Sequence, residues 1–60
     1  MDLRENFLTI YADLPLGLRK EVILILDKEP ISWNVAYIEI FNKTEKSKKI
    51  LKELKEMNII

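Results

Sequence analysis

The side chains best suited to chemistry in this sequence are lysines crowded into its final third. Residues 43–60 hold six lysines and three glutamates, a net charge of +3, whereas residues 1–42 hold four basic and seven acidic residues, a net charge of −3. Clustered lysines attract phosphate groups, so nucleic acid is the ligand to which they point. The formal net charge of zero and the pI near 6.2 are less typical of a nucleic-acid binder.

Catalysis and metal binding are not indicated by any pattern in the chain. There is no cysteine and no histidine, which excludes disulfides, thiolate or imidazole zinc sites and nucleophilic or acid–base work by these residues. Hydroxyl groups without a histidine to activate them occur at Ser32, Thr44 and Ser47. The carboxylates of Asp2, Glu5 and Asp13 are not gathered by any motif. We therefore expect no enzyme, no cofactor and no catalytic or metal-ligating residue.

Two helices are expected in the first half of the chain. Residues 2–13 follow a capping aspartate, Asp2, and place apolar side chains at helical spacing. Pro15 ends that helix and suits the first turn of a second one, expected to extend to about residue 28. The run at residues 22–26 is apolar all round, and periodicity does not distinguish a buried helix from a strand there.

Two further helices are expected in the second half. Ser32 is a good N-cap for a helix that runs to about residue 41, and residues 42–44 form a polar turn. The helix at residues 44–57 has the clearest pattern, with an apolar face opposite a charged one. Asn58 is placed to adopt the left-handed conformation that ends a helix.

The predicted fold is therefore all-α and forms a single helix-turn-helix-like domain over residues 1–60. An extra N-terminal helix, residues 1–13, precedes a three-helix helix-turn-helix core at residues 15–60, with at most a vestigial strand at the C-terminus. The alternative is an α+β protein in which residues 21–26 and 31–41, rich in β-branched and aromatic residues, pair as a hairpin across residues 27–30. A sheet of only two strands is marginal, which favours the helical prediction.

From Pro30 onward, the chain resembles the second half of a winged helix-turn-helix domain. The resemblance is carried by Pro30-Ile31-Ser32-Trp33, the turn at residues 42–44, the Leu51-x-x-Leu54 spacing and Asn58-Ile59-Ile60. In that family, two aliphatic residues after a glycine or asparagine begin the wing. Only Ile59 and Ile60 follow Asn58 here, so a truncated wing is expected. The resemblance implies a DNA-binding protein of the kind that serves as a small transcriptional regulator. It also implies that the last helix enters the major groove of double-stranded DNA.

The residues expected to contact DNA lie at the start of the last helix and on its charged face. They are Lys43, Thr44, Lys46, Lys48, Lys49 and Lys52. A helix N-terminus also favours phosphate. The competing interpretation is that lysine and glutamate only solvate an amphipathic helix, with Glu45–Lys49 and Lys49–Glu53 pairs adding a few tenths of a kcal/mol each.

The assembly and the setting of the protein are also expectations at this point. The apolar fraction of 48% and the extra N-terminal helix indicate a homodimer formed through residues 2–13. A small protein-interaction module or adaptor subunit is the alternative to DNA binding. The aromatic residues could form a base-stacking platform, but their helical spacing beside aliphatic residues favours a place in the core. The composition, rich in Ile, Leu, Lys and Glu, resembles that of hyperthermophile proteins. Without a signal peptide or apolar span, a cytoplasmic location and no membrane contact are expected.

Overall fold

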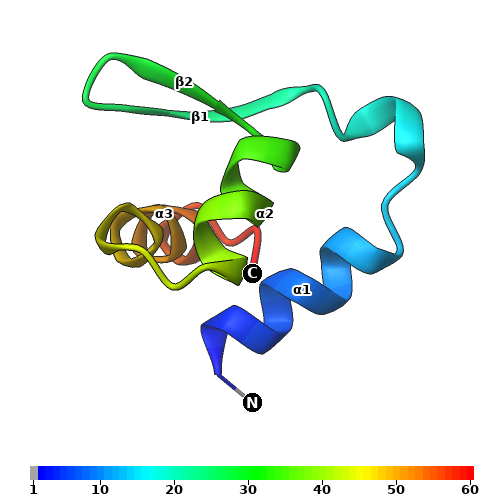
Figure 1. The fold of residues 1–60 in the computed structure, drawn as a ribbon, viewed down its shortest axis with the longest axis horizontal. Helices are drawn as coiled ribbons and strands as arrows, with labels where there is room; N and C mark the ends of the chain where they lie inside the picture. The colour runs from blue at the N-terminus through cyan, green and yellow to red at the C-terminus, as the bar shows by residue number, and fades with distance from the viewer. Residues whose placement is uncertain (1) are drawn as a thin grey trace.

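Three α-helices and one β-hairpin make up the fold (Figure 1). The computed structural model describes residues 2–60; Met1, which the predicted N-terminal segment includes, lies outside the described residues. The order is α1 (Leu3–Ala12), a single 3₁₀ turn η1 (Leu16–Leu18), β1 (Val22–Leu26), β2 (Glu29–Ser32), α2 (Trp33–Phe41) and α3 (Glu45–Glu56). In Figure 1, α3 is viewed almost along its axis while α2 runs across the view, so the two helices cross steeply.

The helices α1, α2 and α3 confirm three of the four predicted helices, together with their caps. Asp2, Ser32 and Thr44 each accept a hydrogen bond from a backbone N–H in the first turn of the helix that follows. Asn58 adopts a φ of 59°, as the sequence predicted for the residue that ends the last helix. No strand follows α3 within residues 2–60. Along this same range, no helix is long and apolar enough to cross a membrane.

The predicted second helix, residues 15–28, is wrong, and with it the all-α fold class. Pro15 begins only the turn η1, and residues 22–26 form β1, which pairs antiparallel with β2. The fold is therefore mixed α/β: the hairpin alternative holds for residues 21–26, although its second strand is only Glu29–Ser32 and the chain from Trp33 is helical.

Local residue preferences explain the hairpin. Asp27 and Lys28 have φ values of 51° and 69°, the paired left-handed conformation of a two-residue hairpin turn. A register shift between Val22 and Leu24 marks a bulge, beyond which buried and exposed side chains alternate as a strand requires. Pro30 is tolerated in β2 because both strands of a two-stranded sheet are edge strands. Because the turn contains no glycine, the sequence lacks the strongest local signal for a hairpin.

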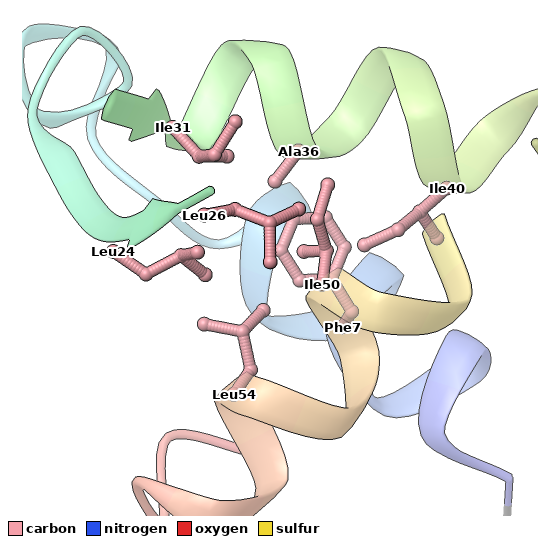
Figure 2. Close-up of a cluster of buried hydrophobic side chains, with 8 residues drawn as sticks. All are labelled: Phe7, Leu24, Leu26, Ile31, Ala36, Ile40, Ile50 and Leu54. Atoms are coloured by element: carbon pink, nitrogen blue, oxygen red, sulfur yellow. The ribbon is translucent and has the colours of Figure 1, made fainter. Parts of the chain in front are cut away.

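A single core joins all the elements and supplies what an isolated hairpin lacks. Figure 2 shows side chains from the hairpin and from the three helices converging on one cluster: Phe7, Leu24, Leu26, Ile31, Ala36, Ile40, Ile50 and Leu54. The hairpin contributes one face, and its strands contact α2 and α3. Two strands that pack on helices are stable where two strands in water are marginal.

The hairpin can be tested by whether one glycine substitution raises or lowers the stability of the protein. We expect Lys28→Gly to stabilise the protein by about 1 kcal/mol, because a non-glycine residue is strained in the left-handed region and glycine is not. Denaturant unfolding monitored by circular dichroism measures the change.

The matched control is Lys52→Gly, which replaces the same residue type in the middle of α3. It should destabilise by about 1 kcal/mol, the ordinary cost of glycine inside an exposed helix. If Lys28→Gly destabilises by a similar amount, residue 28 is helical and the hairpin is absent.

Candidate functional site

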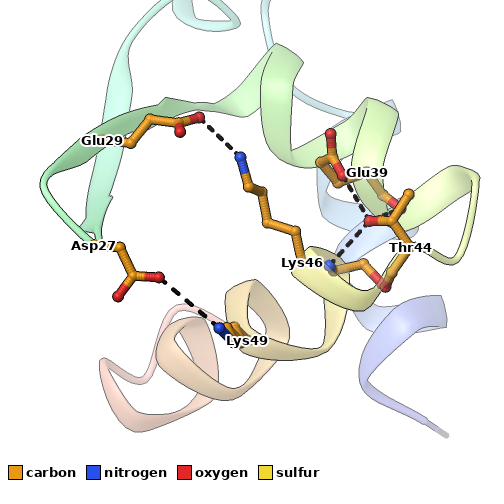
Figure 3. Close-up of polar contacts among 7 residues, drawn as sticks. Asp27, Glu29, Glu39, Thr44, Lys46 and Lys49 are labelled. Atoms are coloured by element: carbon orange, nitrogen blue, oxygen red, sulfur yellow. Dashed lines mark hydrogen bonds and ion pairs between the residues drawn. The ribbon is translucent and has the colours of Figure 1, made fainter.

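The predicted DNA-binding residues lie along α3, and Thr44 is already used in building its start. The Thr44 Oγ1 accepts a hydrogen bond from the backbone N–H of Ser47 at 3.2 Å. The same hydroxyl donates to the Glu39 carboxylate at 2.6 Å (Figure 3). Because both hydrogen bonds use the hydroxyl, Thr44 stabilises the junction between α2 and α3.

Two of the lysines extend toward the hairpin and not away from the protein. The Lys46 Nζ lies 2.9 Å from a Glu29 carboxylate oxygen, and the Lys49 Nζ lies 3.9 Å from Asp27, at the hairpin turn (Figure 3). The hydrogen bond to Glu29 raises the pKa of Lys46 above its ordinary value. The Lys46–Glu29 pair therefore stabilises the folded protein fully at neutral pH. This stabilisation is lost only when a strongly alkaline pH passes through the raised pKa of Lys46. The hairpin acids neutralise part of the predicted basic surface.

The remaining predicted lysines form a smaller exposed group. Lys48 pairs with Glu45 at 3.5 Å, so the Glu45–Lys49 and Lys49–Glu53 pairs expected from the sequence are not those observed. Lys43 is exposed in the turn between α2 and α3, with a φ of 55°. Lys52 is exposed and has no ion-pair partner within residues 2–60. The six predicted residues thus do not form one surface: Lys46 and Lys49 lie toward the hairpin, Lys48 and Lys52 are exposed on α3, and Lys43 and Thr44 belong to the junction before α3.

A second surface, which sequence analysis missed, lies where α1 meets α2. The Tyr11 ring stacks on the Tyr37 ring with centroids 4.3 Å apart, and Tyr37 continues to Phe41 at 5.6 Å. On the inner side, Phe7 contacts both Tyr11 at 6.1 Å and Trp33 at 5.8 Å. All five aromatic side chains of the chain therefore form one connected cluster, buried at Phe7 and open at Phe41.

The segment before β1 completes this surface with a cation. Arg19 places its guanidinium carbon 4.4 Å from the centre of the Tyr11 ring, and its Nη2 donates to the Tyr11 carbonyl at 3.3 Å. The Arg19 carbonyl in turn accepts from the backbone N–H of Asn34 at 3.0 Å, at the start of α2. The Asn34 side chain accepts the Tyr11 hydroxyl at 2.7 Å. These bonds fix Arg19 over α1.

Together these residues enclose an open groove of about 480 Å³. It is lined by Leu8, Tyr11, Ala12, Arg19, Tyr37 and Phe41. Phe41 is 56% exposed, and Ile38, three residues earlier on α2, is 55% exposed. Large apolar side chains exposed next to a groove are typical of a binding surface, although single exposed ones are common. We call these six lining residues the aromatic groove.

The groove brings together apolar and aromatic side chains with one cation. Within residues 2–60, no group of three or more acidic side chains could hold a metal ion. The expectation that the aromatic residues form core holds for Phe7, whereas Phe41 faces outward. A signal for the groove was present in the sequence: Leu8 and Tyr11 sit on the α1 face that carries Arg4, spaced i, i+4 and i+7.

Neither a protein-family model nor a curated protein nor a solved structure matches this chain. The winged helix-turn-helix resemblance thus stays a hypothesis for residues 30–60. The helix expected before that segment is replaced by the β1–β2 hairpin.

Two phenylalanines of the same cluster should differ sharply in their contribution to stability. We expect Phe7→Ala to cost about 3–5 kcal/mol, because Phe7 is fully buried. Phe41→Ala should cost less than about 1 kcal/mol, because most of that ring is already in water. Urea unfolding of both variants measures this, and equal losses would show that Phe41 is core and unavailable to a partner.

Proposed function

We propose that this protein is a small interaction module that docks a segment of a partner protein in the aromatic groove. The observation that carries the proposal is the exposed side chain of Phe41 on the wall of a hollow lined mainly by aromatic and aliphatic side chains. Burying one such side chain contributes about 1.5–3 kcal/mol. Aromatic and arginine side chains are also the residues that dominate protein–protein contacts.

Selection from a random peptide display library tests the proposal. Immobilised protein should enrich peptides with apolar residues, and Phe41→Ala should weaken their binding about tenfold or more, the loss of one buried aromatic contact. The matched control is Ile25→Ala, which removes an exposed apolar side chain from the hairpin and should leave affinity unchanged. If no peptide is enriched, or both variants bind like wild type, the docking proposal fails.

A second copy of the chain is a competing occupant of the same surface. The homodimer through residues 2–13 stays a prediction. Phe7 is fully buried within its own chain, so Leu8, Tyr11 and Ala12 on the groove side of α1 remain for a second molecule. Sedimentation equilibrium at micromolar concentration distinguishes the two: a dimer abolished by Phe41→Ala would assign the groove to self-association. The cytoplasmic location likewise stays a prediction.

DNA binding through α3 is the second proposal, favoured by the exposed lysines at its start. The ion pairs that hold Lys48 and Lys49 are surface pairs, which contribute at most about 1 kcal/mol, so phosphate could replace their partners. Against it, Lys46 and Lys49 lie toward acidic side chains of the hairpin. The docking proposal is therefore preferred.

The triple variant Lys48→Ala, Lys49→Ala and Lys52→Ala tests DNA binding. If the second proposal holds, wild type binds duplex DNA at about 50 mM salt with a log–log salt slope near −3, and the triple variant loses binding. A variant with Lys20, Lys28 and Lys55 replaced by alanine loses the same charge at residues outside the predicted DNA-binding set and should bind almost as wild type. Fluorescence anisotropy measures both, and no binding by wild type at low salt eliminates the proposal.

A further inference from the structure

Arg19 lines the aromatic groove, and Arg4, the other arginine of the chain, lies next to it at the Phe41 end. Arg19 stacks on Tyr11 at the end formed by the C-terminal part of α1. Arg4, at the other end of α1, donates from Nε to the Ile40 carbonyl at 3.2 Å and from Nη2 to the Phe41 carbonyl at 3.3 Å. Arg4 and Tyr11 are seven residues apart in α1, which corresponds to about 10 Å along a helix.

Both guanidinium groups keep donors for a ligand. A guanidinium carries five N–H donors, of which Arg4 uses two on α2 carbonyls and Arg19 uses one on Tyr11. The Nε of Arg19 is buried and has no acceptor within residues 2–60, which is rare for a buried donor. Arg19 is therefore held over the groove mainly by stacking, and its hydrogen bonding is incomplete.

The lining of the groove contains no acidic side chain that would neutralise Arg19. Arg19 is the one charged side chain among the six lining residues. The Tyr11 ring is contacted by both Arg19 and Tyr37, so it offers little free surface on which a nucleic-acid base could stack. Apolar side chains between two carboxylates complement this surface better than a nucleotide does.

We infer that the groove selects an acidic amphipathic segment of a partner protein. Its apolar side chains fill the hollow between α1 and α2, and its Asp or Glu side chains, about two helical turns apart, meet Arg4 and Arg19. This inference rests on the proposed docking function and adds the charge of the partner. Residues 1–42, which include α1 and α2, carry a net charge of −3, so the attraction of an acidic segment has to come from these two side chains.

The peptides enriched by display selection report the partner's charge directly. We expect Asp and Glu to flank the apolar residues more often than in the unselected library. In the tightest-binding peptide, replacing each Asp or Glu by its amide should weaken binding to wild type roughly tenfold at low salt, and the difference should shrink near 1 M salt.

The double variant Arg4→Gln/Arg19→Gln separates charge from packing. It should bind the acidic and amide peptides equally, with the affinity that wild type has for the amide peptide, which also shows that the groove is folded. If the double variant does not fold, Arg4→Gln alone should remove the preference for one of the two carboxylates, since glutamine can still donate to the α2 carbonyls.

Three results would overturn the inference. Enriched peptides that are neutral or basic, and that need Phe41, leave docking intact and remove only the acidic partner. No enriched peptide at all removes both proposals. An oligonucleotide of thymidines that displaces the peptide from wild type and not from the double variant assigns the arginines to phosphate.

Discussion

The contacts of Tyr11 hold three separate parts of this chain in register. Its ring stacks on Tyr37 of α2, its hydroxyl donates to Asn34, and Arg19 from the segment before β1 contacts both its ring and its carbonyl. One side chain thus joins α1, α2 and the approach to the hairpin. The aromatic groove exists because these contacts hold α1 beside α2 with Leu8 and Phe41 on its walls.

The hairpin constrains the other side of the molecule in a comparable way. Its inner face completes the core through Leu24, Leu26 and Ile31, while its turn carries acids that meet the lysines of α3. The hairpin acids therefore neutralise part of the basic face of α3, while the groove between α1 and α2 is open.

Sequence reasoning succeeded where the signal is local. Caps at Asp2, Ser32 and Thr44 and the amphipathic pattern of α3 fix helix positions, because a capping hydrogen bond and a 3.6-residue period depend on neighbours in the chain. The sequence left the hairpin only as an alternative to a helix, since its turn uses Asp27 and Lys28 in place of glycine and its first strand is apolar on both faces. The groove depends on Arg19 meeting Tyr11 across a turn, a contact that no spacing encodes.

Chemical-shift mapping by NMR tests the groove most directly. Isotope-labelled protein titrated with the tightest-binding peptide should show its largest changes at the Leu8 and Ala12 methyl groups and the Tyr37 and Phe41 rings. Arg4 and Arg19 side-chain signals should shift with the acidic peptide and much less with its amide counterpart. Changes concentrated on Lys48 and Lys52, or spread evenly over the hairpin, would contradict the assignment of the binding surface to the junction of α1 and α2.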